Sequence, residues 1–355
     1  MDIVINPAII ENRAKPPDSD LGFGTYFTDH MFMMDFNRDQ GWHNARVEPY
    51  GPLSLDPAAQ VLHYNQEVFE GTKAYHQPDG GITLFRPEKN IERMNTSAAR
   101  LAMPTIDPGD YLEAIKALVL IDKDWVPVSN GTALYIRPTL IATEASLLVR
   151  PSDNYLFYII LSPVGSYYTE GLNPTKIYAT DEYARATPGG AGETKTSGNY
   201  APTLLAASDA MRRGYTQVLW LDSTKRKYIE EVGTSNIFFL INDEIVTPPL
   251  GGTILPGITR DSIIQLAKHW GLKIVERRIT IDEVIKAIGD RSLKEVFASG
   301  TAAVISPVGT IGYQDKDHTV ADGQIGTLSQ KLYDEITGIQ YGHIEDPFGW
   351  RIKIA

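Results

Sequence analysis

The chain has 355 residues, of which 43% are hydrophobic, and it contains 30 glycines, 22 prolines and no cysteine. This composition is typical of a globular protein, and the length exceeds the roughly 250–300 residues that one core serves, so two domains are expected. The 33 basic and 44 acidic residues leave a net charge of −11, which argues against nucleic acid or an anionic membrane as a partner.

The first half of the chain predicts strands, a hairpin and two helices. β-Branched and aromatic residues are dense in segments expected to be strands, at 26–36, 67–76, 82–86, 132–143 and 154–164. The segment Gln77–Gly81 has the composition of a hairpin turn between the second and third of these. Pro87 begins a predicted helix with an apolar face, and a second helix is expected at 111–124.

The second half mixes strands and helices without strict alternation. Strands are expected at 176–181, 215–221, 236–247 and 294–298, and helices at 200–213, 259–270 and 325–340. This order favours a mixed α/β (α+β) fold over one doubly wound sheet. We predict a smaller N-terminal α/β domain at 1–165, a linker rich in turn-forming residues at 166–175 and a larger C-terminal domain at 176–355.

Several classes of protein are disfavoured. No apolar run reaches the ~18–20 residues that a bilayer span requires, and residues 1–10 have no basic leader, so neither a membrane protein nor a secreted one is expected. The lack of cysteine excludes disulfides, thiolate-ligated zinc and a thiol nucleophile, and a reducing cytoplasm is the expected location. The seven histidines show no i, i+4 helical pair, so no metal is predicted.

Four residues or segments are candidates for chemistry. Lys195 lies in a loop of small residues before a helix, where it is either a solvated lysine or a Schiff-base lysine. The amides of Ile258 and Thr259 begin a helix, which is either an ordinary helix start or a phosphate site. Arg93 is either one partner of a surface ion pair or a residue that binds a phosphate. Glu231, if it is buried against a heterocyclic nitrogen, keeps that nitrogen protonated; otherwise it is solvated.

Eight strings in order make the chain from about residue 23 to 342 resemble the branched-chain amino-acid aminotransferases, pyridoxal-phosphate enzymes of fold type IV. The strings are Phe27–Met31, Val68–Gly71, Tyr135–Thr139, Leu161–Gly165, Gly198–Tyr200, Glu231–Thr234, Ile254–Gly257 and Ser299–Ala302. The resemblance implies two domains with the active site at their interface, and pyridoxal 5'-phosphate as cofactor.

The resemblance also implies roles for individual residues around the cofactor. Lys195 is then the Schiff-base lysine and the catalytic residue, Tyr200 bonds the phenolic oxygen, and Glu231 pairs with the pyridine nitrogen. The other expected cofactor-binding residues, chiefly toward the phosphate, are Arg93, Thr234, Ile258, Thr259 and Thr301.

The same resemblance implies a substrate pocket and a homodimer. The expected substrate-binding residues are Phe23, Tyr64, Phe69, Tyr135, Arg137, Tyr167, Thr301 and Ala302; for the aromatic ones, plain core packing is the alternative. Arg137 is the candidate for the γ-carboxylate of glutamate, with a structural ion pair as its alternative. Val149 resembles the loop that reaches the other subunit's site. Ala303–Ser306 replaces the two-cysteine redox motif of animal members, so thiol regulation cannot operate.

The predicted activity is transfer of the amino group of L-leucine, L-isoleucine or L-valine to 2-oxoglutarate, by a ping-pong mechanism. Another fold-type IV enzyme is the nearest alternative: a D-amino-acid or amine aminotransferase, or an aminodeoxychorismate lyase. A non-catalytic protein that binds a phosphorylated ligand at the helix after Gly257 is a more distant alternative. The partners expected are these small-molecule substrates and a second copy of the chain.

Overall fold

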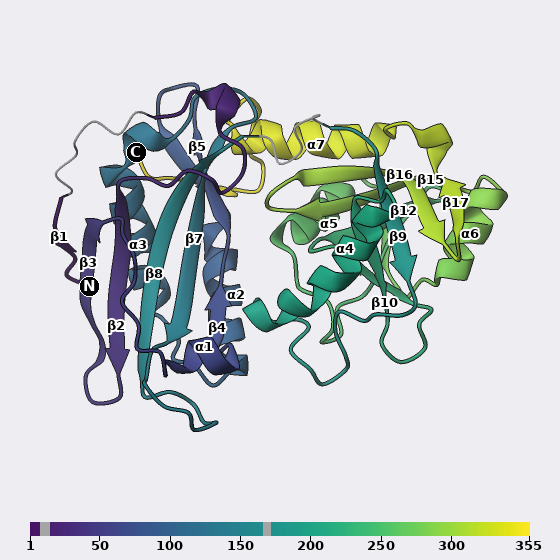
Figure 1. The fold of residues 1–355 in the computed structure, drawn as a ribbon. Coiled ribbons are helices and arrows are strands. Elements are labelled where there is room, and N and C mark those ends of the chain that lie inside the picture. The colour runs from purple at the N-terminus through teal and green to yellow at the C-terminus, as the bar shows by residue number, and fades with distance from the viewer. Residues whose placement is uncertain (8–14, 166–171) are drawn as a thin grey trace. The chain divides into compact units, whose positions relative to one another are not determined.

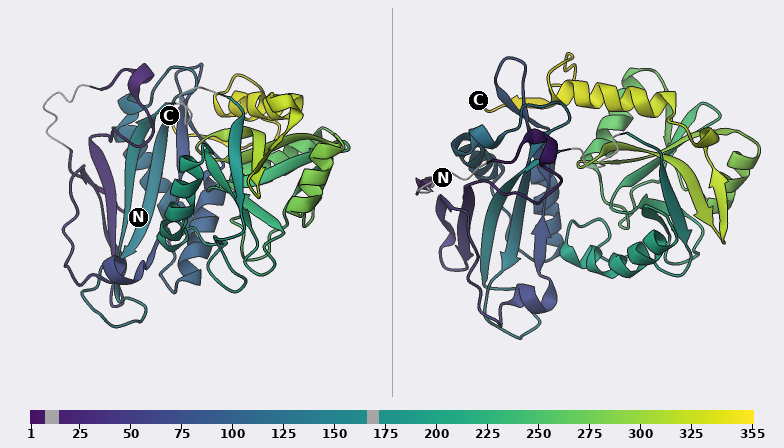
Figure 2. Two further views of the ribbon diagram at one scale, coloured as in Figure 1. Left: turned by 45° about the vertical axis from the view of Figure 1, so that its right-hand side comes forward. Right: turned by 45° about the horizontal axis from the view of Figure 1, so that its top comes forward.

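The computed structural model describes residues 1–7, 15–165 and 172–355, and the chain divides into two compact units (Figure 1). Unit 1 comprises the described residues of Met1–Thr169, together with Lys195–Ser197 and Gly338–Ala355. Unit 2 comprises those of Glu170–Thr194 and Gly198–Thr337. Among the described residues, each unit is built on one nine-stranded sheet. Both sheets are visibly twisted in the views of Figure 2, as expected for L-amino acids.

The sheet of unit 1 is mostly antiparallel and has the order β1-β3-β2-β8-β7-β5-β6-β18, with β4 also paired to β7. Its strands are β1 (Val4–Ile5), β2 (His30–Asn37), β3 (Gly41–Pro49), β4 (Glu67–Phe69), β5 (Thr72–His76), β6 (Ile82–Phe85), β7 (Ala133–Ala142), β8 (Asn154–Val164) and β18 (Arg351–Lys353). β5 and β6 form the predicted hairpin, which is confirmed. The predicted strand 67–76 is interrupted at Glu70 and Gly71, where a buried acid replaces a regular strand position.

Helices cover one face of this sheet. They are α2 (Pro87–Arg100) and α3 (Pro108–Ile121), while the short α1 (Gln60–Tyr64) precedes β4. α2 begins at Pro87 as predicted, and its Ile91, Met94 and Ala98 are buried. They join Phe32 and Phe157 of the sheet in one core cluster, so the apolar face of α2 explains its position.

The sheet of unit 2 has the order β11-β10-β9-β16-β15-β12-β13-β14, with β17 paired to β16. Its strands are β9 (Thr175–Thr180), β10 (Gln217–Leu221), β11 (Ile229–Val232), β12 (Asn236–Ile241), β13 (Glu244–Thr247), β14 (Lys273–Glu276), β15 (Leu293–Gly300), β16 (Val304–Tyr313) and β17 (Lys316–Thr319). Parallel and antiparallel pairs are mixed, for example β9–β10 and β10–β11.

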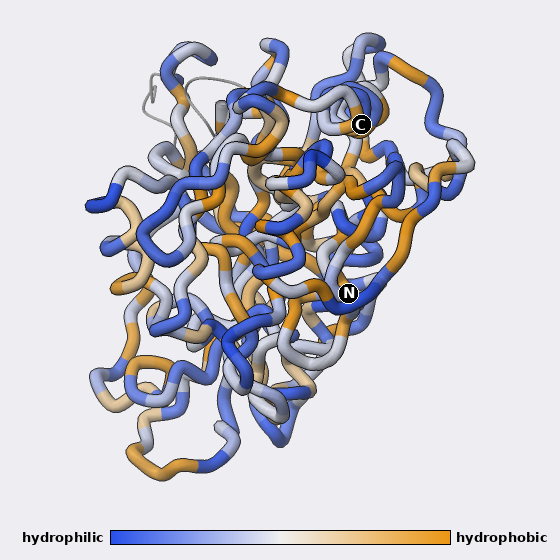
Figure 3. The backbone as a smooth tube through the Cα atoms, turned by 90° about the vertical axis from the view of Figure 1, so that its right-hand side faces the viewer, coloured by the Kyte–Doolittle hydropathy of each residue, from blue (hydrophilic) through white to orange (hydrophobic). Residues whose placement is uncertain are grey.

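Four α-helices are described in unit 2 or at its boundary: α4 (Leu204–Arg212), α5 (Ile258–His269), α6 (Ile281–Gly289) and α7 (Thr327–Gln340). α4 packs its Ala206 and Ala210 against β10, and α6 packs Ile281 and Val284 into the main core of the unit. Hydrophobic stretches run along the strands and helices, whereas many outer loops are hydrophilic (Figure 3). None of the helices in the described part of the chain has the length and apolarity to cross a bilayer.

The units divide the chain differently from the predicted domains at two places. Lys195–Ser197 clusters with unit 1, although the residues on either side belong to unit 2. The end of the chain also returns to unit 1, because β18 adds an antiparallel strand to β6, from Arg351 opposite Phe85 to Lys353 opposite Thr83. The sequence offers no signal for this return, since a three-residue edge strand has no periodicity.

Candidate active site

Lys195 is held against unit 1 by its own backbone. Its N–H donates to Ser97 Oγ of α2 at 3.0 Å, and its carbonyl accepts from the N–H of Phe69 at 3.1 Å. The next residue, Thr196, donates its hydroxyl to the carbonyl of Glu67 at 2.7 Å. The segment therefore lies beside β4, and Lys195 Nζ lies 4.9 Å from the centroid of the Phe69 ring. Lys195 is half-buried, unlike a solvated loop lysine.

Arg93 forms a buried ion pair with Glu70. Its Nε lies 2.7 Å from Glu70 Oε1 and its Nη2 lies 2.9 Å from Oε2, while Asn90 donates to Oε2 at 2.8 Å. Burial alone raises the pKa of Glu70, but the charge and hydrogen bonds of Arg93, with smaller contributions from Lys195 and Asn90, outweigh it and hold this pKa below its usual range. The pair fixes the orientation of the Arg93 guanidinium, which is not at the surface.

Tyr135 and Arg137 project from β7 on the same face of the sheet, because alternate residues of a strand share a face. Arg137 Nη2 donates to the Tyr135 hydroxyl at 3.2 Å, and the guanidinium stacks on Phe69, 4.8 Å from its centroid. Phe23 meets Tyr135 edge-on at 5.1 Å. A Cβ at Gly71 would lie 1.9 Å from the Tyr135 hydroxyl, so glycine at this position is what lets the tyrosine approach β5.

Glu67 adds a carboxylate to this face of unit 1. Burial raises its pKa, while a hydrogen bond from Ser197 and the positive charge of Arg137 oppose that shift. The structure thus brings Lys195 together with four of the predicted substrate-binding residues, Phe69, Tyr135, Arg137 and Phe23. The face combines aromatic walls with a cation.

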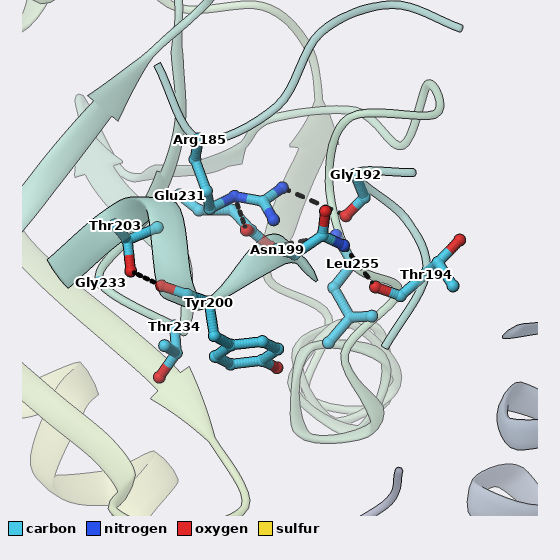
Figure 4. A pocket seen from close by; sticks show the side chains of 10 residues that line it. All are labelled: Arg185, Gly192, Thr194, Asn199, Tyr200, Thr203, Glu231, Gly233, Thr234 and Leu255. Carbon is cyan, nitrogen blue, oxygen red and sulfur yellow. Dashed lines mark hydrogen bonds and ion pairs between the residues drawn. The ribbon is translucent and has the colours of Figure 1, made fainter. Parts of the chain in front are cut away.

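Unit 2 contributes a polar pocket (Figure 4). Its lining residues are Arg185, Gly192, Thr194, Asn199, Tyr200, Thr203, Glu231, Gly233, Thr234 and Leu255. The enclosed cavity is about 20 Å³, which is room for roughly one water, so this unit by itself supplies polar groups rather than a closed chamber. The predicted cofactor residues Tyr200, Glu231 and Thr234 all line it. Thr194 lines it too, and the next residue along the chain is Lys195.

Glu231 is a buried carboxylate held entirely by donors. Arg185 Nε lies 2.7 Å from its Oε2, while Asn236 Nδ2 and the N–H of Leu255 donate to its Oε1 at 3.2 and 3.0 Å. Figure 4 shows the Arg185 guanidinium turned toward this carboxylate and toward the carbonyl of Gly192. Glu231 is buried, so the alternative of a solvated acid is wrong; its partner in the chain, Arg185, was not foreseen.

Asn236 organises the phosphate-site candidates. Besides Glu231, its Nδ2 donates to the carbonyl of Leu255 at 2.9 Å, and a Cβ at Gly257 would lie 2.0 Å from its Oδ1. Gly257 is the N-cap of α5, so Ile258 and Thr259 occupy the first turn, where amides lack partners within the helix. Because Asn236 approaches Gly257 so closely, α5 begins next to β11, the strand that contains Glu231.

The turn that contains Thr301 and Ala302 lies at the same end of the sheet as Asn236. Ser299 of β15 pairs with Asn236 of β12, and a Cβ at Gly300 would lie 3.2 Å from Ser235 Oγ. The turn ends at Val304, which has φ +61°, a left-handed conformation that is strained for a β-branched residue. Such strain is concentrated at functional sites. The turns of Thr234 and Thr301 are thus neighbours.

For three predicted residues the structure records no contact with this pocket among the described residues. Tyr64 is 40% exposed and donates its hydroxyl to the carbonyl of Leu147 at 2.5 Å, so its recorded contact is with the 144–150 loop. Val149 of that loop is 85% exposed. Tyr167 lies outside the described residues.

Sequence reasoning missed three residues that hold the site together: Glu70, Arg185 and Asn236. Glu70 could have been found, because an acid among strand-forming apolar residues demands a buried partner. Arg185, between two alanines in a glycine-rich stretch, carries no pattern that distinguishes it from a surface arginine. Asn236 acts only through tertiary contacts.

Comparisons with known proteins consistently identify aminotransferases. Residues 67–311 match the family described as amino-transferase class IV. A branched-chain-amino-acid aminotransferase 2 of Bacillus subtilis is 56% identical over 343 residues, which cover 97% of this chain and 94% of that protein.

Solved structures agree with the sequence comparison. The branched-chain aminotransferase of Escherichia coli has a TM-score of 0.77 at 26% identity, covering 92% of this chain and 100% of that one. Another branched-chain aminotransferase was solved as a complex with N-(5'-phosphopyridoxyl)-L-glutamate, the phosphopyridoxyl-glutamate complex. It has a TM-score of 0.74 at 25% identity, covering 92% of this chain and 99% of that one. The fold is that of the type IV enzymes. The chain belongs to the class IV aminotransferases, which depend on pyridoxal phosphate, and within this class to the branched-chain-amino-acid aminotransferases.

Proposed function

We propose that this enzyme moves the amino group of L-leucine, L-isoleucine or L-valine to 2-oxoglutarate, in two half-reactions with ping-pong kinetics. The observation that carries the proposal is the position of Arg137, whose guanidinium stacks 4.8 Å from the Phe69 centroid and donates to Tyr135. Aromatic walls suit a branched apolar side chain, and the cation at their edge suits the γ-carboxylate of glutamate. One pocket can therefore serve both substrates in turn.

The residues of unit 2 fit pyridoxal phosphate. Glu231 lies beside the Arg185 cation and accepts from Asn236 and the N–H of Leu255, and a carboxylate held in this way would pair with a protonated pyridine nitrogen. Thr194 Oγ1, in the same pocket, is buried and has no hydrogen-bond partner among the described residues. A polar ligand atom would satisfy it. Tyr200 would bond the phenolic oxygen.

The phosphate and the substrate carboxylate have separate candidates in this proposal. The Ile258 and Thr259 amides at the start of α5, with Arg93, Thr234 and Thr301, would hold the phosphate. The amides of Thr301 and Ala302 would take the α-carboxylate. The strand pairs on either side of this turn, Ser299 with Asn236 and Gly300 with Val304, hold its two ends.

The bound cofactor supplies an electron sink for the negative charge that develops at the substrate α-carbon. The chain's own work is then positional and acid–base. Lys195 Nζ removes the α-proton as a general base, and Glu231 keeps the proton on the pyridine nitrogen. Arg185 keeps Glu231 in place through their 2.7 Å ion pair.

Leucine, isoleucine and valine should all react, because one methylene separates substrates by only ~1–3 kcal/mol in an apolar pocket. The enzyme of the phosphopyridoxyl-glutamate complex has also been solved with 4-methylvaleric acid. Both ligand classes on one related enzyme support a shared pocket here.

The test is Arg137→Ala, assayed one half-reaction at a time through the absorbance of the bound cofactor. The KM for glutamate and 2-oxoglutarate should rise about 10- to 100-fold, the equivalent of one charge-assisted hydrogen bond, while that for leucine changes little. Arg212→Ala, at a surface ion pair with Asp209, is the control. Equal losses for leucine and glutamate would refute the assignment, and turnover of D-alanine in place of L-leucine would indicate a different branch of the fold type.

A homodimer is part of the proposal. Leu147, Leu148 and Val149 form a contiguous apolar stretch that is 63%, 64% and 85% exposed, and stretches of this kind mark interfaces. In the dimer, Val149 of the partner subunit would complete the pocket. The cytoplasmic location stays a prediction.

A further inference from the structure

A second cavity in unit 2 lies apart from the pocket of Glu231 and shares no lining residue with it. It measures about 330 Å³, within the range of about 300–1,000 Å³ that is usual for small-molecule pockets. Tyr228 and Glu230 of the β11 region, Arg278, and the loop with Pro248 and Leu250 are among the residues that line it. The proposed reaction gives this cavity no role.

β11 contributes to both pockets: Glu231 lines one, whereas Ile229 and Glu230 line the other. The pairing of β11 with β10 shifts register at Glu230, so the side chains there do not follow strict alternation. Glu230 Oε1 accepts from the Thr253 hydroxyl at 2.6 Å, but its Oε2 is buried without a hydrogen-bond partner among the described residues. An unsatisfied buried acceptor is costly, and a ligand that donates there would remove the cost.

A cation lies at another wall of the cavity. The Arg278 guanidinium stacks on the ring of Tyr228, 3.6 Å from its centroid, and Lys225 Nζ lies 6.0 Å from the same centroid. Arg278 lies near enough to Glu230 to act on its charge, yet no direct ion pair joins the two among the described residues. Asp222, the other acid of the cavity, is already satisfied by three backbone N–H groups.

The remaining walls are apolar, with Pro248, Leu250 and Ile254 among them. A ligand that matches this cavity has a positive group for Glu230, a negative group for Arg278 and an apolar body between the prolines and Leu250. We propose that the cavity is a second binding site for an α-amino acid with an apolar side chain, with its ammonium on Glu230 Oε2 and its carboxylate on Arg278.

Occupation of this site has a physical route to Glu231. The Thr253 hydroxyl bonds Glu230, and the Thr253 carbonyl accepts from Arg185, whose Nε lies 2.7 Å from Glu231. A Cβ at Gly192 would lie 2.7 Å from the Thr253 carbonyl oxygen, so this contact is tight. A ligand that repositions Glu230 therefore displaces Thr253 and, through Arg185, the environment of Glu231. Any coupling must be reciprocal.

The experiment uses holoenzyme reduced with borohydride, in which turnover is blocked, and L-leucine as the probe. Binding is measured by calorimetry, with the absorbance of the reduced cofactor recorded alongside. We expect saturable binding that weakens at least tenfold in both Glu230→Gln and Arg278→Ala and is unchanged in Arg212→Ala, a surface arginine paired with Asp209. Leucine held in the substrate pocket would not respond to these variants.

Two results would overturn the proposal: no saturable binding, or binding that neither Glu230→Gln nor Arg278→Ala weakens. Thermal unfolding of each variant establishes that it is folded. Should a variant fail to fold, the wild-type reduced enzyme soaked in L-leucine decides, because electron density in this cavity supports the site and its absence rejects it. The proposed reaction is tested separately, before any leucine is added. If borohydride does not attach the cofactor to Lys195, the mass of the protein does not increase, and the proposed function fails independently of the second site.

Discussion

Lys195 and Phe69 are joined at two levels, by a 3.1 Å backbone hydrogen bond and by the ammonium of Lys195 lying 4.9 Å from the Phe69 centroid. The backbone bond ties the lysine segment to β4, which is itself paired to β7. The backbone position of Lys195 is therefore set by its bonds to β4 and α2 as well as by its own loop.

Replacing the lysine tests its central role. Lys195→Ala should lower kcat by about 10³-fold or more, because both a covalent anchor and a general base are lost. Mass spectrometry after borohydride treatment should find the cofactor on wild-type protein and not on the variant. Lys294→Ala, at an exposed lysine, is the control. Retained turnover in Lys195→Ala would end the proposed mechanism.

Gly71→Ala should act on substrate binding more than on folding. The new methyl group would lie 1.9 Å from the Tyr135 hydroxyl, so the tyrosine must shift and its 3.2 Å bond with Arg137 is lost. The KM for both leucine and glutamate should rise about tenfold, because the displaced Tyr135 ring no longer lines the pocket as it does in the wild type. Gly289→Ala, where a Cβ meets nothing within 4 Å, should change neither value. Unaltered KM values with Gly71→Ala would show that Tyr135 does not shape the pocket.

Arg185→Met should destabilise the protein by about 3–5 kcal/mol, because it leaves Glu231 charged and buried without its cation. Adding Glu231→Gln should restore much of this stability but not the affinity for pyridoxal phosphate. Urea unfolding of the apoenzyme and cofactor titration measure the two quantities. A surface replacement, Arg212→Met, should cost less than about 1 kcal/mol. Equal stability of Arg185→Met and wild type would remove Arg185 from the proposed machinery.

Lys73 should give the unfolding free energy a pH dependence. Burial lowers its pKa to about 8 from 10.5, so between these values the unfolded chain binds the proton and the folded chain does not. Stability should therefore rise as the pH increases from about 8 to 10.5, by up to about 3 kcal/mol, and this dependence should vanish below pH 8, where both states bind the proton. Lys73→Met should lack this rise. The check is urea unfolding of both proteins across that range; parallel curves would contradict a neutral Lys73.

Local sequence signals predicted much of the fold. The turn composition of Gln77–Gly81 predicted the β5–β6 hairpin, and the apolar spacing after Pro87 predicted α2, because both depend on residues close in the chain. The sequence marks Glu70 as an acid that needs a buried partner, but it does not predict that the strand breaks there, since the break depends on Arg93 more than twenty residues away. Strand pairings such as β18 with β6 are likewise set by the whole chain.

The site was predictable only in part. Motif resemblance located Lys195, Tyr200 and Glu231, and the structure puts Lys195 beside Phe69 and the other two in one pocket. Partners such as Arg185 and Asn236 could not be inferred, because their importance lies in which buried group they touch. Tyr64 was placed in the pocket by the resemblance alone, and the contact that the structure gives for its hydroxyl is with the carbonyl of Leu147.

The return of the chain to unit 1 bears on how the protein is made. β18 follows the whole of unit 2 in the sequence, yet it completes the edge of the first sheet beside β6. On the ribosome, unit 2 emerges before that edge can be covered, so a nascent chain holds an open strand edge during most of synthesis. Short truncations at the carboxyl end should therefore expose β6 and promote aggregation of the newly made protein.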